Sequence, residues 1–242
     1  MEEWTSDNMG EFPVLTRQQV RRFDAWAMDS MNIPGVVLME NAGRSCASLV
    51  LQMLEGKTRP KVCIFCGAGN NGGDGFVIAR QLCNADVAVK IVVCANPAKI
   101  EGDAKIHYEI CRNMHLPIQV LDVESDSLCV DVEKAAQGCD FLVDAIFGTG
   151  LAGELRSAYA VLISCINSHN IPIVAVDIPS GLDCDTGLPL PVCIEAKATV
   201  TFVAIKKGFT QSPESRKATG RVFVADIGIT PQLPEAQKKG RS

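Results

Sequence analysis

Oxygen-bearing side chains follow three short apolar stretches of this 242-residue chain. The first stretch ends at Cys66 and runs into residues 67–75, which hold five glycines, two asparagines and one aspartate. The second contains Asp144 and leads into a glycine-rich loop, and the third ends at Asp177, shortly before Ser180. Carboxylate, amide and hydroxyl oxygens bind polar ligands and alkali or alkaline-earth cations, and a carboxyl group can also exchange a proton.

The glycine-rich segment 67–75 contains the spacing Gly67-x-Gly69-x-x-Gly72 of a dinucleotide-binding loop between a strand and a helix. That motif also needs an acidic residue about 20 positions on, at the end of the next strand, to hold the adenosine ribose. The strand expected at 87–93 ends in Cys-Ala-Asn instead. Asp74, expected at the start of the following helix, would cap free N–H groups but repel a pyrophosphate. The segment therefore favours a ligand bound by amide oxygens and a carboxylate over an ordinary NAD cofactor.

The three polar segments are expected to meet at one edge of a sheet, because open parallel sheets bind ligands beyond the carboxyl ends of their strands. The alternative is that the aspartates cap helices and the glycines only make turns. Three segments of the same acid and amide character favour a single site. Asp144 lies inside an apolar strand, where a carboxylate is costly to bury, so it needs hydrogen-bond donors, a cation or a ligand. The residues expected at this edge are Asn71, Asp74, the loop 148–153, Asp177 and Ser180.

Short apolar strands alternate with helical patterns along the chain, which predicts an α/β protein with a doubly wound, mostly parallel sheet. Asn41 interrupts the apolar face of the second helix, and it is either satisfied by its neighbours or directed at the ligand crevice. We expect helices at 17–30, 36–54, 102–114 and 125–138, and strands at 63–66, 87–93, 118–121, 141–147, 173–177, 198–204, 206–209 and 221–227.

The composition excludes several classes of protein. The formal charge of −5 gives no basic face for nucleic acid. Eleven cysteines are scattered through apolar runs, and we expect buried free thiols of a reducing cytosol rather than disulfides. Cys63 and Cys66 have no second pair to complete a zinc set. His107, His115 and His169 lack ligand spacing and are expected at the surface.

The chain ends and the hydropathy indicate a cytoplasmic protein. No apolar run approaches the roughly 20 residues of a membrane span. The start Met1-Glu2-Glu3-Trp4 lacks the basic and apolar regions of a signal peptide. We expect a flexible leader over 1–13, one folded domain over 14–230 and a flexible tail over 231–242.

Several long motifs in one order resemble the NAD(P)H-hydrate epimerase family, also called the YjeF N-terminal domain family. The resemblance covers about residues 14–230. Its motifs are Leu38-Met39-Glu40-Asn41-Ala42-Gly43-Arg44, Gly69-Asn70-Asn71-Gly72-Gly73-Asp74-Gly75, Val143-Asp144-Ala145-Ile146-Phe147-Gly148-Thr149-Gly150, Val176-Asp177-Ile178-Pro179-Ser180-Gly181-Leu182 and Thr199-Val200-Thr201-Phe202.

The resemblance implies a three-layer α/β/α Rossmann-like fold, commonly dimeric, that epimerises hydrated NADH or NADPH at C6 so that a separate dehydratase can repair the S form. It also implies a potassium ion held by Asn71, Asp144 and Ser180. The family includes members thought to act as binding or scaffold modules, so a non-catalytic nucleotide-binding or protein-interaction module is the alternative. The residues that the resemblance assigns to the nucleotide are Asn70, Asn71, Gly72, Gly73, Asp74, Gly148, Thr149, Gly150, Leu151, Ala152, Gly153, Glu154 and Asp177.

For the chemistry we expect an acid to assist departure of the C6 hydroxyl as water, after which water returns on either face. Asp144 and Asp177 are the candidate catalytic residues, and the sequence does not rank them. Lys197 stands where members of the family often carry an aspartate, so no role is carried over to that position.

Overall fold

The computed structural model describes residues 1–8, 10–151 and 153–230. The expected tail 231–242 and Ala152 of the expected substrate loop lie outside the described residues. The main sheet has eight strands in the order β1-β10-β8-β7-β6-β3-β4-β5, and every neighbouring pair is parallel except β1 with β10. Its strands are β1 (Glu2–Trp4), β3 (Lys61–Cys66), β4 (Ala88–Val93), β5 (Ile118–Val120), β6 (Phe141–Ala145), β7 (Ile173–Val176), β8 (Ala198–Phe202) and β10 (Arg221–Ala225).

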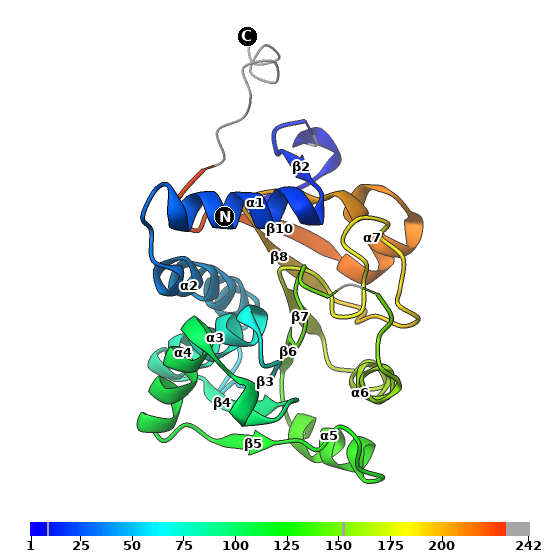
Figure 1. The fold of residues 1–242 in the computed structure, drawn as a ribbon. Coiled ribbons are helices and arrows are strands. Elements are labelled where there is room, and N and C mark those ends of the chain that lie inside the picture. Colours follow the sequence, from blue (N-terminus) through cyan, green and yellow to red (C-terminus); the bar gives the residue numbers. More distant parts are fainter. Residues whose placement is uncertain (9, 152, 231–242) are drawn as a thin grey trace.

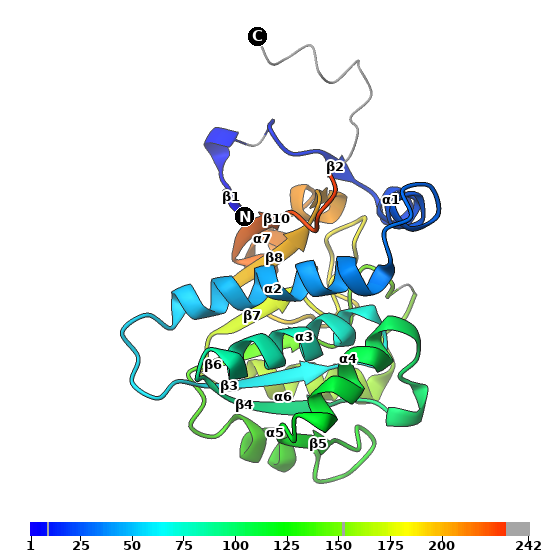
Figure 2. The ribbon, with the colours of Figure 1, turned by 90° about the vertical axis from the view of Figure 1, so that its left-hand side faces the viewer.

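Helices cover both faces of this sheet, which confirms the three-layer α/β/α architecture (Figure 1). One face carries α2, α3 and α4, and the other carries α5, α6 and α7. Figure 2 shows α1 beside the carboxyl ends of the central strands. The helices are α1 (Arg17–Asp29), α2 (Gly35–Met53), α3 (Asn70–Asn84), α4 (Gly102–Asn113), α5 (Leu128–Ala136), α6 (Ser157–Asn167) and α7 (Pro213–Thr219).

Each helix layer has its own apolar core against the sheet. Alternate residues of a strand point to opposite faces, so Ile64 of β3 packs under α2 and α3 while Phe65 packs under α5 and α6. Both side chains are fully buried. Strands covered on both faces in this way read as continuous apolar runs, which is why the sequence located them correctly.

The N-terminal segment is structured, contrary to the expected flexible leader. Glu2–Trp4 forms β1, which pairs antiparallel with β10, and Arg221 of β10 binds the Glu3 carboxylate at 2.6 Å. The short strand β2 (Val14–Leu15) pairs with β9 (Ile205–Lys206) in a second, two-stranded sheet. Such pairings join residues about two hundred positions apart, and local sequence pattern does not reveal them.

Two helices and one turn differ from the expectation. α6 and α7 occupy stretches for which no helix was predicted. The strand expected at 206–209 is instead β9 followed by a 3-10 turn, Lys207–Thr210. The remaining predicted helices and strands are present with ends shifted by a few residues.

The cysteine and histidine expectations are only partly correct. Cys129 of α5 and Cys165 of α6 form a disulfide, whereas the other nine cysteines are free. The two helices pack side by side, so cysteines 36 positions apart meet. His107 is 3% exposed rather than on the surface, and burial lowers its pKa.

The described part of the chain holds no helix long and apolar enough to span a membrane. The predicted cytoplasmic location remains a prediction.

Candidate functional site

A cavity of about 690 Å³ lies beyond the carboxyl ends of β3, β6 and β7. After β3, the strands β4 and β5 continue the sheet in one direction. The next strands, β6, β7, β8 and β10, continue it from β3 in the other direction. The cavity therefore occupies the point at which the strand order reverses, where open α/β sheets bind their ligands. Its volume is within the roughly 300–1,000 Å³ of small-molecule sites.

The glycine-rich segment forms the first turns of α3 rather than a loop before it. α3 begins at Asn70, after Gly69. A Cβ added to Gly72 would lie 1.9 Å from the backbone oxygen of Gly67, and one added to Gly75 would lie 2.6 Å from Cys66 Sγ. The absent side chains let the helix start against the end of β3. Asp74 is consequently in the second turn, and the prediction that it caps this helix is wrong.

The structure brings most of the predicted substrate residues to the cavity. Gly72, Gly73, Gly153 and Glu154 are described but do not line it. The predicted residues that line it are Asn70, Asn71, Asp74, Gly148, Thr149, Gly150, Leu151 and Asp177.

Asp177 follows β7 and is held in an unusual backbone conformation, with φ of 65°. Its amide donates to the carbonyl of Val200, at 2.7 Å. Left-handed backbone at a residue other than glycine costs roughly 1–3 kcal/mol and is found at functional sites. The turn directs the carboxylate into the cavity, where Oδ1 lies 2.7 Å from Lys206 Nζ.

Lys206 is a fully buried cation in the cavity wall. Its Nζ donates to the carbonyl of Phe202, at 3.1 Å, and forms the ion pair with Asp177. A buried ammonium group needs a counter-charge, because removing it from water without one is costly. Lys206 and Asp177 therefore act as one electrostatic unit.

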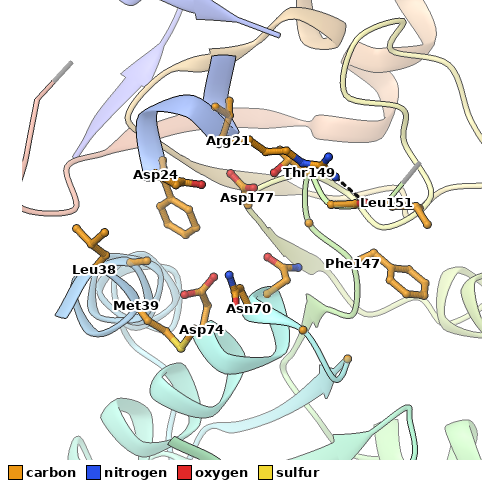
Figure 3. A pocket seen from close by; sticks show the side chains of 18 of the residues that line it. Arg21, Asp24, Leu38, Met39, Asn70, Asp74, Phe147, Thr149, Leu151 and Asp177 are labelled. Carbon is orange, nitrogen blue, oxygen red and sulfur yellow. Dashed lines mark hydrogen bonds between the residues drawn. The ribbon is translucent and has the colours of Figure 1, made fainter. Parts of the chain in front are cut away.

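Three carboxyl groups point into the same space from three elements: Asp24 from α1, Asp74 from α3 and Asp177 after β7 (Figure 3). Burial raises the pKa of Asp74 well above its usual range, and the charges of Asp177 and Asp24 add to the shift. Burial also raises the pKa of Asp24 to about 6, with the same sign of contribution from Asp177 and an opposing one from Lys206. Acids with raised pKa values in a cleft are candidates for proton transfer near neutral pH.

Asp144 and Ser180 lie behind the cavity wall rather than in it. Asp144 is 1% exposed, and its carboxyl accepts three hydrogen bonds: from Ser180 N at 2.7 Å, Ser180 Oγ at 2.6 Å and Ile146 N at 3.2 Å. Burial raises the pKa of Asp144 to about 6, and these hydrogen bonds oppose the shift. The donors required by a carboxylate inside an apolar strand are therefore present.

Arginines of α1 bind the loop that follows β6. Arg17 Nε donates to the Thr149 carbonyl at 3.0 Å, and Arg21 Nη2 donates to the Gly150 carbonyl at 3.4 Å. Arg17 is also paired with Asp183 at 2.6 Å. These contacts place α1 across the mouth of the cavity.

Asn41 is satisfied by a neighbouring residue and is not directed at the ligand crevice. Its Nδ2 donates to the Ile227 carbonyl at 2.8 Å, and it does not line the cavity. Lys197 is exposed and lies away from the cavity. The departure from the family pattern at that position therefore leaves the site unchanged.

The sequence interpretation missed Asp24 and Lys206. Asp24 shares a helical face with Val20 and Met28, and that spacing was the available signal. Lys206 follows Val-Ala-Ile, and a lysine after an apolar run signals a charge that needs a partner.

A Rossmann-like three-layer fold with an acid-lined cavity at its strand-reversal point defines a small-molecule-binding α/β protein. Residues 35–208 match the family described as "YjeF-related protein N-terminus", and the chain belongs to this family.

Alignments with two named relatives cover most of this chain. It is 38% identical over 226 residues to the "NAD(P)H-hydrate epimerase" of Rhodopirellula baltica, an alignment that covers 92% of this chain and 87% of the relative. It is 40% identical over 229 residues to the "Bifunctional NAD(P)H-hydrate repair enzyme Nnr" of Moorella thermoacetica. That alignment covers 94% of this chain but only 43% of the bifunctional enzyme.

A solved structure shares the fold. The crystal structure of yeast ynu0, YNL200c, superposes with a TM-score of 0.74 at 23% identity, and the match covers 92% of this chain and 96% of the yeast chain.

Proposed function

We propose that this chain is an NAD(P)H-hydrate epimerase, an isomerase that interconverts the R and S forms of hydrated NADH and NADPH at C6. The observation that carries the proposal is the convergence of Asp24, Asp74 and Asp177 on one cavity of a chain whose relatives bear this name. The reaction needs an acid that gives up a proton and a carboxylate that accepts one, and this cavity supplies carboxyl groups of both kinds.

The cavity also suits the charge that develops during the reaction. When the C6 hydroxyl leaves as water, the ring nitrogen shares its electrons with C6 and the ring becomes cationic. Fixed carboxylates near a developing positive charge stabilise it without reorganisation of solvent. Asp177 is the carboxylate that the chain holds most firmly, through its backbone turn and its ion pair with Lys206.

Asp144 is better suited to holding a cation than to transferring a proton to substrate, because it does not face the cavity. We propose that Asn71, Asp144 and Ser180 hold a potassium ion. Asn71 is 7% exposed, and its Nδ2 has no hydrogen-bond partner in the described residues. The proposed ion would be bound by the other end of this amide, the Oδ1 oxygen. Carboxylate, hydroxyl and amide oxygens form a hard donor set that fits an alkali cation. The ion would supply positive charge beside the nucleotide.

Substrate contacts are proposed for the predicted residues that line the cavity. Asn70 and Asn71 at the start of α3 would meet anionic or polar groups of the nucleotide, since a helix N-terminus offers free N–H groups. The loop Gly148–Leu151, fixed by the α1 arginines, would cover the ligand. Glu154 and Gly153 would take part only through movement of this loop.

The partners remain proposals. The repair function requires a dehydratase that consumes the S form, and the bifunctional relatives bear a repair name while being more than twice as long as this chain. We also propose a homodimer in which α1 or α2 contributes the interface, as the exposed side chains of Met31 and Val37 favour. Light scattering at micromolar concentration would show a mass of two chains, and a monomer would contradict the proposal.

Catalysis is separated from mere binding by supplying one purified isomer of hydrated NADPH and following the other by chromatography. An epimerase brings either isomer to the same R-to-S ratio, at a rate proportional to protein concentration. A nucleotide-binding module would bind the compound and leave the spontaneous rate unchanged, which would contradict the proposal.

A further inference from the structure

One face of α1 forms a wall of the cavity. Val20, Asp24 and Met28 line it at helical spacing, together with Phe23 and Arg21. Ala27 is the residue of this helix that is fully buried. The opposite part of the helix packs on α2 through Trp26 and Ala27, so the helix joins the site to an apolar cluster.

Nothing in the motifs assigns a role to this helix, and the family match begins at residue 35, after its end. Specific hydrogen bonds nevertheless hold this helix in place. Its start is fixed by a capping box between Thr16 and Gln19. Arg17 and Arg21 then tie it to the loop after β6. These contacts fix the direction in which Asp24 points.

Asp24 faces charged groups from several elements across the cavity. Asp177 and its partner Lys206 interact with it electrostatically, and Asp74 of α3 does so as well. The other ionisable side chains that line the cavity are Arg21, Lys99, Asp103 and Tyr159. Asp177 forms an ion pair with the buried Lys206, whereas Lys206 acts on Asp24 only through its charge.

This asymmetry gives the two carboxyl groups different surroundings. The ion pair consists of the Asp177 carboxylate and the Lys206 ammonium group. Burial and the nearby Asp177 charge both favour the neutral form of Asp24 and raise its pKa to about 6. Carboxyl groups that share one cavity but lie in unlike environments commonly serve as acid and base in one reaction.

We infer that Asp24 is a further catalytic residue of the proposed epimerisation, acting as the acid in the cavity that it shares with Asp177. The inference rests on the proposed function. Asp24 donates its proton to the C6 hydroxyl, the C6–O bond breaks with its electron pair on the departing water, and the ring-nitrogen lone pair forms the bond to C6. A water molecule then attacks C6 on the other face and gives its proton to Asp177. Transfer of that proton through solvent to Asp24 restores both groups.

The test compares Asp24→Asn and Asp24→Glu with Asp29→Asn, which changes an exposed carboxyl on the same helix. Asp24→Asn is expected to lower kcat for hydrated NADPH by about 10²–10⁴-fold while changing KM by less than about fivefold. Asp24→Glu restores a carboxyl group and is expected to recover part of kcat. Asp29→Asn is expected to match the wild type.

The pH profile distinguishes an acid from a structural residue. The wild-type kcat should fall as the pH rises through about 6. Asp24→Asn should lose this dependence in its residual activity, and Asp24→Glu should keep it. A kcat within threefold of wild type in folded Asp24→Asn, or an unchanged pH limb in that variant, would overturn the inference. Should Asp24→Asn fail to fold, an Asp24→Glu variant without the limb would overturn it equally. A wild-type protein that is inactive on both isomers would instead overturn the proposed function, and this inference with it.

Discussion

Ser180 donates two hydrogen bonds to the Asp144 carboxyl group, from its backbone nitrogen at 2.7 Å and from its hydroxyl at 2.6 Å. The same hydroxyl accepts a bond from the backbone nitrogen of Phe147, at 2.8 Å. One fully buried serine thus connects the end of β6, the loop after it and the turn after β7. This connection fixes the two loops that flank the candidate site.

Removing the hydroxyl in Ser180→Ala should destabilise the protein by about 1–3 kcal/mol, because the buried Asp144 carboxyl and the Phe147 amide each lose a partner. Ser164→Ala is the control, since that hydroxyl binds the Ala160 carbonyl on an exposed helix face. Urea denaturation measures both. Equal stability of the two variants would show that the Ser180 hydroxyl contributes nothing.

Soaking crystals with rubidium should give an anomalous peak beside Asn71, Asp144 and Ser180, because their oxygens suit an alkali cation. Asp144→Asn should weaken the peak and raise the potassium concentration needed for full activity. A site without density at full occupancy of nucleotide would contradict the potassium proposal.

Asp24 should make the protein less stable as the pH rises. Its folded pKa of about 6 exceeds the ordinary value of 3.8, so the folded state holds the proton more tightly between these values. The contribution of Asp24 to stability is therefore greatest below about pH 4, falls through the interval to about pH 6 and stays lower above it. Asp24→Asn should remove this loss and be more stable than wild type at pH 7.5 by up to about 3 kcal/mol, the full value of the pKa shift, and by less where solvent screens the charge.

The control for this effect is the same pair of proteins at pH 4, where the two free energies of unfolding should nearly coincide. A difference that does not change between pH 4 and pH 7.5 would refute the assignment of the pH dependence to Asp24.

Gly72→Ala should destabilise the protein by about 3 kcal/mol, because the new Cβ would meet the backbone oxygen of Gly67 at 1.9 Å. An unobstructed helical glycine would show the opposite sign, since alanine favours a helix by about 1 kcal/mol. Gly69→Ala, at the N-cap just before α3, is the control for crowding, because no atom lies within 4 Å of its added Cβ. It should cost much less than Gly72→Ala. Thermal melting decides between the two signs.

The sequence was sufficient for the elements whose pattern is local. Strands such as Ile173–Val176 are apolar throughout because both faces are covered, and the polar residues after them lie at one edge by the geometry of parallel sheets. Asp177 and Asn71 were predicted at the site for this reason, and both line the cavity. The family was predicted from the motifs, and the match over residues 35–208 confirms it.

Long-range placement was beyond the sequence. Whether Asp144 faces the cavity depends on which side of β6 its side chain takes and on what Ser180 brings to it. The position of α1, and with it Asp24, depends on contacts with a loop more than a hundred residues away. The ion pair of Lys206 with Asp177 likewise depends on the fold, because the two residues are far apart in the sequence.

The central claim, that the carboxyl groups of this cavity catalyse epimerisation at C6, is tested most directly with Asp177→Asn. The measurement is the rate at which pure R hydrated NADPH approaches the R-to-S equilibrium, followed by chromatography in the wild type and in the variant, with native melting as the check on folding. The substitution keeps the shape of the side chain but removes its charge and its capacity to accept a proton. We predict a loss of two orders of magnitude or more, in line with the typical 10²–10⁴-fold effect of an acid–base group. A folded Asp177→Asn protein that epimerises near the wild-type rate would contradict the claim.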